Sequence, residues 1–129
     1  MPLILVVEDV ALARDAVARL LETEGFQTER AANGKEAYAK LYSNKPDLVL
    51  LDLMMPELDG ITLLRMIRQH PQWETIPIIV LTALPDENRL VARARELGVK
   101  EIVSKTTFGF EELMQRIRKT MGNRLASEN

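Results

Sequence analysis

Two segments of the chain place carboxylates directly after apolar runs, where they could hold a cation. Glu8 and Asp9 follow the run Leu3–Val7, and Asp52 follows the run Leu48–Leu51 within the stretch LVLLDLMMPELDG. Burying a lone carboxylate costs several kcal/mol unless a partner neutralises it. We therefore expect Asp52 to be exposed to a crevice at a strand end rather than buried.

Two further polar residues follow apolar runs in the same way. Thr82 follows the run 78–81, and Lys105 follows the run 102–104, whose last residue is the small Ser104. In an open parallel sheet the residues after each strand gather at the carboxyl edge, where ligand crevices form. This edge should therefore combine three carboxylates, a hydroxyl and an ammonium group.

The three carboxylates would repel one another strongly if they met there. Two like charges about 4 Å apart repel by roughly 4 kcal/mol at an effective dielectric of ~20, so three pairs approach the stability of a whole domain. Lys105 offsets part of this repulsion, and a divalent cation would offset most of it. Because hard oxygen ligands suit magnesium, we predict that Glu8, Asp9 and Asp52 form a Mg²⁺ site whose open positions accept a phosphoryl group.

Strands and helices must alternate along the chain to position these groups. The expected strands are 3–7, 26–32, 48–51, 76–81 and 101–104, and the expected helices are 11–24, one that begins after Asn33, 59–69, 86–97 and 110–121. This order predicts an α/β fold with a parallel sheet and helices on both faces. The nearly continuous apolar strands favour the same fold class.

Local signals support several of these elements. Asn33 with Glu36 three residues later is typical of a helix start, as is Asp59. Gly25 and Gly98 are expected to end helices. The polar strand 26–32 suits a sheet edge. The inward-facing residues are expected to be Leu12, Ala16, Leu20 and Leu21 in the first helix and Leu113, Met114, Ile117 and Met121 in the last, with Gly122 just past its end.

Composition limits the class of protein. The 129 residues suffice for one domain, expected to span 1–122 with a flexible tail at 123–129. Cysteine is absent, which fits a reducing compartment such as the cytoplasm. A net charge of −2 gives no sign of direct nucleic acid binding by this domain. The first apolar run is too short for a signal peptide or a membrane span.

Four motifs together resemble the receiver domain of two-component response regulators: VVEDV, LVLLDLMMPELDG, IPIIVLTA and EIVSK. The resemblance extends over about residues 3–121. It implies a flavodoxin-like (βα)5 three-layer sandwich with a five-stranded sheet in the order 2-1-3-4-5. It also implies a phosphoacceptor regulatory domain, not an enzyme in its own right, that assists its own phosphorylation and dephosphorylation.

The resemblance assigns a role to each candidate residue. Asp52 matches the phosphoacceptor and also a metal ligand, Asp9 matches the direct magnesium ligand, and Glu8 matches an acidic neighbour that often acts through water. Met54 matches the position whose main-chain carbonyl completes the ligands. The phosphoryl oxygens would be bound by Thr82, the N–H of Ala83 and Lys105.

The sequence also departs from the family pattern at three positions. Thr106 replaces the usual proline after the late lysine, and Phe108 lies one residue later than expected. Ile102 stands where many members have an aromatic ring that turns inward on phosphorylation. These changes leave the acceptor chemistry intact and put a familiar aromatic switch in doubt.

Other classes of protein fit the sequence less well. A flavodoxin-like cofactor binder would not place Glu8 and Asp9 where phosphate must bind. The P-loop motif is absent, and an aspartate-nucleophile phosphohydrolase typically has a second Asp where Met54 stands. The most serious alternative is a phosphorylation-independent receiver-like interaction module. His70 precedes a proline at a helix end, away from the site, and is given no functional role, whereas Trp73 in the same loop is interpreted as a packing residue.

The resemblance also implies partners. A sensor histidine kinase or phosphotransfer protein would donate the phosphoryl group, and the first helix is the expected kinase-docking element. A downstream effector protein or a homodimer would bind through the fourth helix, fifth strand and fifth helix. This region carries the basic residues Arg89, Arg93, Arg95, Lys100, Arg116, Arg118 and Lys119. No membrane partner is expected.

Overall fold

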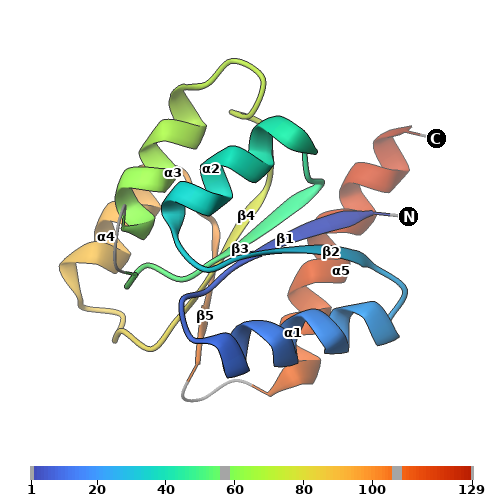
Figure 1. The fold of residues 1–129 in the computed structure, drawn as a ribbon. Helices are drawn as coiled ribbons and strands as arrows, with labels where there is room; N and C mark the ends of the chain where they lie inside the picture. Colours follow the sequence, from blue (N-terminus) through green and yellow to red (C-terminus); the bar gives the residue numbers. More distant parts are fainter. Residues whose placement is uncertain (1, 56–58, 106–108, 129) are drawn as a thin grey trace.

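The chain forms five alternating strand–helix units (Figure 1). The computed structural model describes residues 2–55, 59–105 and 109–128, and the side chains of the last helix through Gly122. The strands are β1 (Leu3–Val7), β2 (Gln27–Ala31), β3 (Leu48–Leu51), β4 (Ile78–Thr82) and β5 (Glu101–Ser104). The helices are α1 (Ala11–Thr23), α2 (Gly34–Ser43), α3 (Gly60–Gln69), α4 (Arg89–Glu96) and α5 (Phe110–Glu128).

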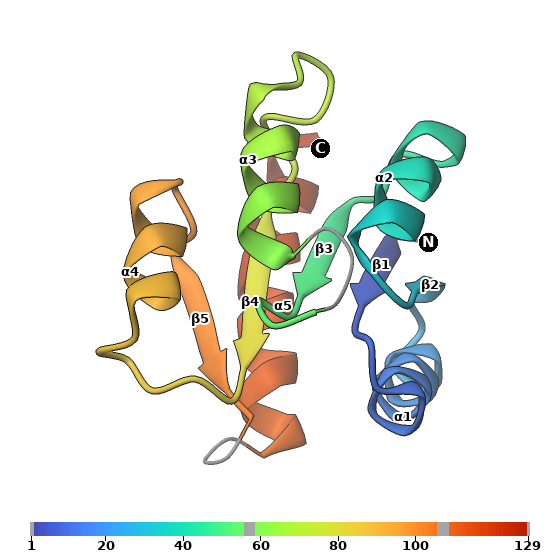
Figure 2. The same ribbon diagram turned by 60° about the vertical axis from the view of Figure 1, so that its left-hand side comes forward.

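All strand pairs are parallel, and the sheet order is β2-β1-β3-β4-β5. This confirms the predicted α/β fold and strand order. Helices α1 and α5 cover one face of the sheet, and α2, α3 and α4 cover the other (Figures 1 and 2). The polar strand β2 lies at an edge, as its sequence indicates.

Each central strand is buried on both faces, which explains why its sequence is apolar throughout. In β1, Leu5 and Val7 belong to the core under α2, α3 and α4, whereas Ile4 and Val6 belong to the core under α1 and α5. Side chains of successive strand residues point to opposite faces. A strand between two helical layers therefore needs apolar residues at every position.

Several helix boundaries follow the local signals in the sequence. Asn33 accepts a hydrogen bond from the N–H of Glu36 at 2.8 Å, and Asp59 accepts one from the N–H of Thr62 at 2.9 Å. Gly25 follows α1 with φ 95°, and Gly98 follows α4 with φ 92°. Such positive φ values strain residues with a Cβ, so glycine is favoured there.

Other boundaries and faces differ from the sequence-based expectations. In α1 only Leu21 of the expected inward stripe is buried; Leu12, Ala16 and Leu20 are exposed, and Ala18 takes the buried position instead. Helix α4 begins at Arg89 rather than near residue 86, because Asn88 caps it. Strand β4 begins two residues later than expected and includes Thr82.

The last helix is longer than expected. It continues through Gly122 to Glu128 instead of ending near Met121, because glycine is tolerated within a helix at a cost of about 1 kcal/mol. Its expected inward residues are confirmed, since Leu113, Met114, Ile117 and Met121 are all buried. Across the described ranges, no helix combines the length and hydropathy that crossing a bilayer requires.

Candidate functional site

The three predicted carboxylates meet at the carboxyl edge of the sheet. Glu8 and Asp9 follow β1, Asp52 follows β3, and these two strands are direct neighbours. One oxygen from each of the three side chains lies within 4.8 Å of the other two. Carboxylate oxygens are the donors that magnesium prefers, so the residues present fit such an ion.

Asp52 is buried, which corrects the expectation that it would be exposed to the crevice. It is 7 % exposed and Glu8 is 5 % exposed, whereas Asp9 is exposed. Burial is possible because the Lys105 ammonium binds both buried carboxylates, with 3.0 Å from Nζ to Asp52 Oδ2 and a direct contact to Glu8 Oε1. Formal charges of −3 and +1 leave the cluster at −2.

Main-chain groups hold the buried carboxylates in place. The N–H of Met54 donates to Asp52 Oδ1 at 3.2 Å, and the N–H of Val10 donates to Glu8 Oε2 at 3.3 Å. The N–H of Asp52 donates to the carbonyl of Val7 at 3.1 Å, which continues the strand pairing up to the site. Both acids are therefore oriented before any ligand arrives.

Thr82 and Ala83 lie at the end of β4, beside the end of β5. Thr82 is 1 % exposed, and its hydroxyl accepts a hydrogen bond from the N–H of Leu84 at 3.1 Å. The carbonyl of Thr82 accepts from the N–H of Lys105 at 2.8 Å, which fixes the backbone from which the lysine extends. Ala83 is exposed.

Two groups of the cluster have shifted pKa values. The pKa of Asp9 is raised above its ordinary value by loss of hydration, and also by a hydrogen bond and charge repulsion from Glu8. Burial alone would lower the pKa of Lys105, but hydrogen bonds and attraction from Glu8 and Asp52 raise it overall. The negative charge of Glu8 contributes to both shifts, whereas loss of hydration is the largest cause for Asp9.

The loop after Asp52 is open to solvent on one side. Met54 is 56 % exposed, whereas Met55 packs against the core under α2, α3 and α4. A depression of about 610 Å³ borders the acidic cluster and gives a ligand access to it. It is lined by Asp9, Leu53, Met54, Met55, Asp59 and Leu90.

Sequence reasoning identified Gly60 only as a turn residue of this loop and missed Arg14, and both residues shape this site. A Cβ on Gly60 would lie 2.5 Å from the carbonyl oxygen of Asp52 and 2.6 Å from Cα of Leu53, so only glycine lets α3 approach the backbone of Asp52 and Leu53 this closely. Arg14 donates from Nη1 to the carbonyl of Glu8 at 3.1 Å. Gly60 was visible in the motif as a turn residue, but Arg14 gave no signal.

The remaining sequence-based candidates lie elsewhere or outside the described residues. His70 stacks on Trp73 with centroids 3.7 Å apart. Trp73 is 1 % exposed, which confirms that it is a packing residue. Ile102 packs against the core under α4. The departures at Thr106 and Phe108 lie outside the described residues, as does Pro56 of the acceptor loop.

The family model for the response regulator receiver domain matches residues 4–118, so the chain belongs to this family. It is therefore a regulatory receiver domain of two-component signal transduction. One relative is the phosphate regulon transcriptional regulatory protein PhoB of Rhizobium meliloti, 40 % identical over 118 residues that cover 92 % of this chain and 51 % of the relative. The chain spans about half the length of PhoB and of several other relatives that it matches.

Solved structures show the same fold. The receiver domain of a signal transduction histidine kinase from Syntrophus aciditrophicus is 35 % identical, with a TM-score of 0.87, and the match covers 95 % of this chain and 92 % of that domain. The response regulator TrrA from Thermotoga maritima, solved in complex with Mg²⁺ and BeF, is 35 % identical with a TM-score of 0.79. That match covers 93 % of this chain and 99 % of TrrA.

Proposed function

We propose that Asp52 accepts a phosphoryl group from the phosphohistidine of a sensor histidine kinase or phosphotransfer protein. The observation that carries this proposal is the convergence of Glu8, Asp9 and Asp52 within 4.8 Å, beside Lys105. One Asp52 oxygen forms a bond to phosphorus while the N–P bond of phosphohistidine breaks. The imidazole nitrogen keeps the electron pair and then takes a proton from solvent.

The described site supports this chemistry without a general base. A carboxylate is already ionised at neutral pH, so Asp52 needs no group to remove a proton. The lone histidine, His70, stacks on Trp73 and is not required as a base for this transfer. Phosphoryl transfer depends mainly on placement and charge neutralisation, and the hydrogen bonds to Asp52 from Met54 and Lys105 support placement.

Magnesium would be held by the carboxylates of Glu8, Asp9 and Asp52 and the main-chain carbonyl of Met54. When bound, it supplies positive charge that offsets the repulsion between the acidic groups and the phosphoryl oxygens. The net charge of −2 on the cluster matches the charge of a divalent cation and supports such an ion as its ligand. The Mg²⁺–BeF complex of TrrA, a relative of the same family, is consistent with this role.

Lys105, Thr82 and the N–H of Ala83 would bind the phosphoryl oxygens. Lys105 already touches Asp52, so its ammonium can pair with negative charge added there. Thr82 is buried one strand away, and its hydroxyl would turn from its present bond with the Leu84 N–H. Such turning would alter the segment that leads to α4. The same groups would assist transfer to Asp52 and later hydrolysis.

The partner surfaces are proposed from the family and from exposure. On α1, Leu12 and Leu20 are 86 % and 41 % exposed, which supports docking of a kinase or phosphotransfer protein on this helix. The output surface would be α4, β5 and α5, for an effector protein or a homodimer. Two matched relatives are named transcriptional regulatory proteins, so the absence of direct nucleic acid binding by this domain stays a prediction.

The boundaries of the receiver domain and the cellular compartment of the protein are also proposals. Residues 1–122 would form the receiver domain and 123–129 a flexible tail, although the helix that reaches Glu128 makes this division less sharp. The absence of cysteine supports a reducing compartment such as the cytoplasm. The phosphorylation-independent interaction module remains the second candidate, favoured only by Ile102 and Thr106.

The test compares the wild-type chain with Asp52→Asn, which keeps the shape of the side chain and removes its charge. Saturating Mg²⁺ with beryllofluoride should shift the amide resonances of the residues around 52, 82 and 105 in the wild type and leave those of the variant unchanged. Equal responses, or no response in the wild type, would exclude Asp52 as the acceptor and favour the interaction module.

A further inference from the structure

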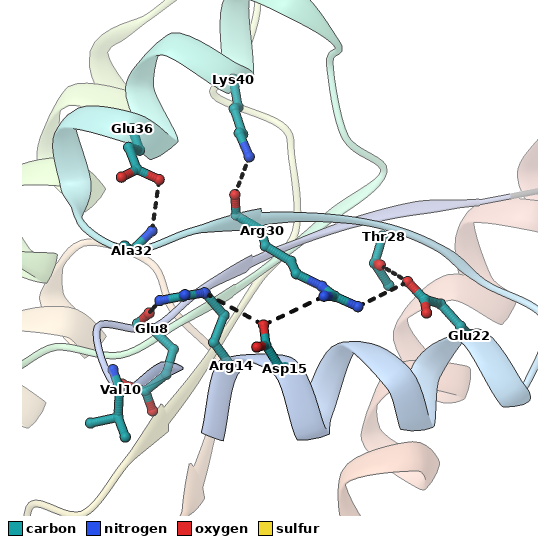
Figure 3. A network of polar contacts seen from close by, with 10 residues as sticks. All are labelled: Glu8, Val10, Arg14, Asp15, Glu22, Thr28, Arg30, Ala32, Glu36 and Lys40. Atoms are coloured by element: carbon teal, nitrogen blue, oxygen red, sulfur yellow. Dashed lines mark hydrogen bonds and ion pairs between the residues drawn. The ribbon is translucent and has the colours of Figure 1, made fainter. Parts of the chain in front are cut away.

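The main chain that carries Glu8 and Asp9 is held by Arg14, a side chain to which the chemistry above assigns no task. Figure 3 shows Arg14 reaching back from the first turn of α1 to the main-chain oxygen of Glu8, at 3.1 Å from Nη1. Only 18 % of the Arg14 side chain is exposed. That oxygen belongs to the planar peptide joining Glu8 to Asp9. The hydrogen bond therefore restricts the orientation of this peptide, and with it the position from which the Asp9 side chain extends.

Helix α1 lacks the capping side chain that would otherwise fix this loop. Its N-cap residue, Val10, makes no side-chain cap, and the Val10 N–H donates to the Glu8 carboxylate instead. The same carboxylate pairs with Lys105. A cation that draws on the Glu8 carboxylate would compete with the Val10 N–H for its oxygens. The bond from Arg14 is independent of that carboxylate, because it uses the main-chain oxygen.

A series of ion pairs that runs from Asp15 through Arg30 to Glu22 also contacts the Arg14 guanidinium (Figure 3). Asp15 Oδ1 lies 3.9 Å from Arg14 Nε and 3.4 Å from Nη1 of Arg30, on the edge strand β2. Arg30 Nη2 lies 3.5 Å from Glu22 Oε2. These two arginines and two acids carry no net charge together. The charge of Arg14 is thus balanced locally, which favours a role in placement over a long-range electrostatic role.

We propose that Arg14 is a positioning residue that sets the Glu8–Asp9 loop for metal binding, and that Asp15 and Arg30 orient it. The proposal rests on the proposed function, because it concerns the affinity of the same site for Mg²⁺. Partners one step removed from a metal typically change its affinity 10- to 100-fold when they are removed. Since Arg14 acts through a main-chain oxygen, we expect a change at the low end of that range, about 10-fold.

Two substitutions at this position separate placement from charge. Arg14→Met removes both the donor and the charge, whereas Arg14→Lys keeps the charge and loses the planar fork of donors. If Arg14 positions the Glu8–Asp9 loop, both variants should bind Mg²⁺ more weakly than the wild type. A purely electrostatic role predicts that Arg14→Met binds Mg²⁺ more tightly, since it removes a positive charge, and that Arg14→Lys resembles the wild type.

The experiment is an NMR titration of the whole chain with Mg²⁺, following the amide resonances of residues 8–10 and 54. Arg19→Met is the matched control, because Arg19 is exposed on the same helix; its dissociation constant should equal that of the wild type. Asp15→Asn should weaken binding less than Arg14→Met does. Thermal unfolding without Mg²⁺ reports separately any loss of stability.

The outcomes distinguish a failure of the proposed role of Arg14 from a failure of the proposed Mg²⁺-dependent function. Weaker Mg²⁺ binding by both Arg14 variants supports the inference, and Arg14→Lys serves alone if Arg14→Met does not fold. Lower thermal stability with an unchanged dissociation constant would overturn it, because Arg14 would then only stabilise the fold. If the wild type itself binds no Mg²⁺, the proposed function fails, and this inference fails with it.

Discussion

The two ends of the central sheet differ in how far their polar groups are compensated by neighbouring residues. At the carboxyl edge, Lys105 is the one cation that pairs with the cluster of Glu8, Asp9 and Asp52 among the residues that the structure describes. Towards the amino end, a cluster between α2 and the segment after α3 contains Tyr38, Tyr42, His70 and Trp73. Its rings meet edge-to-face or stacked, with centroids 3.7 to 5.6 Å apart.

The tyrosine hydroxyls and the His70 ring nitrogens of this aromatic cluster have partners within it or beside it. The Tyr42 hydroxyl lies 3.4 Å from His70 Nε2, and the N–H of Gln72 donates to His70 Nδ1 at 3.2 Å. Nothing there requires a ligand for balance. The comparison teaches that, among the described residues, uncompensated charge lies at one end of the sheet, where a bound cation would lower the energy, and close aromatic packing lies at the other.

Removing Trp73 should have the largest effect on stability and none on the site. Trp73 is 1 % exposed and contacts both tyrosines and His70. Trp73→Ala should lower the free energy of unfolding by about 3–5 kcal/mol, measured by denaturant titration, while the Mg²⁺ dissociation constant stays unchanged. A changed Mg²⁺ affinity in the folded variant would show that the two ends are coupled.

Lys105→Met should destabilise the other end in a way that Mg²⁺ reverses. The substitution leaves two buried carboxylates without the Lys105 ammonium, and in the absence of metal it should lower the free energy of unfolding by about 2 kcal/mol. This loss is smaller than is usual for a buried ion pair, because the lysine side chain is 25 % exposed. Mg²⁺ should then raise the melting temperature more than it does in the wild type. Equal stabilisation of the two proteins by Mg²⁺ would contradict the picture of unbalanced charge.

Asp9→Asn should raise stability at neutral pH in metal-free solution. An acid whose pKa is higher in the folded state contributes stability below its ordinary pKa of 3.8 and loses that contribution as pH rises through the folded value. The variant should therefore melt higher than the wild type at neutral pH, and the difference should vanish below about pH 3.8. Because Asp9 is exposed, the gain should stay under about 1 kcal/mol. A lower melting temperature at neutral pH would contradict the sign of this effect.

Tyr42→Phe should have the smallest effect. Tyr42 is 61 % exposed, and its hydroxyl contacts His70 and Tyr38 at 3.4 and 3.5 Å, which are long hydrogen bonds. The free energy of unfolding should change by less than about 0.5 kcal/mol. A loss comparable to that in Trp73→Ala would show that the polar contacts, rather than the packing of the rings, hold this end together.

Much of the fold was predictable because local and tertiary requirements agree. The strands read as continuous apolar runs since both faces are covered, and Asn33 and Asp59 begin helices by their own hydrogen bonds. The face of α1 was not predictable, because its sequence offers more than one apolar stripe. Packing on the sheet selects Ala18 and Leu21 and leaves Leu12 exposed.

The acidic cluster was predictable from the order of residues alone. Parallel strands bring Glu8 and Asp52 to one edge whatever the details of packing. The burial of Asp52 depends on the reach of Lys105, a contact between residues 53 positions apart. Gly60 was recognisable in the motif as a turn residue, but its close approach to the main chain of Asp52, where an added Cβ would lie 2.5 Å from the carbonyl oxygen, was not. Arg14 donates a 3.1 Å hydrogen bond to a main-chain oxygen, and such a contact leaves no side-chain pattern to recognise.

The most direct measurement is the position of the phosphoryl group on the chain. The protein would be incubated with Mg²⁺ and a small phosphodonor, the acyl phosphate reduced with borohydride, and the resulting homoserine located by peptide mass spectrometry. We predict homoserine at residue 52 in the wild type, and none there when Mg²⁺ is removed or in Asp52→Asn. Homoserine at Asp9, or the five-carbon alcohol 5-hydroxynorvaline at Glu8, in place of homoserine at residue 52 would contradict the proposed roles of these acids, as would labelling that does not depend on Mg²⁺.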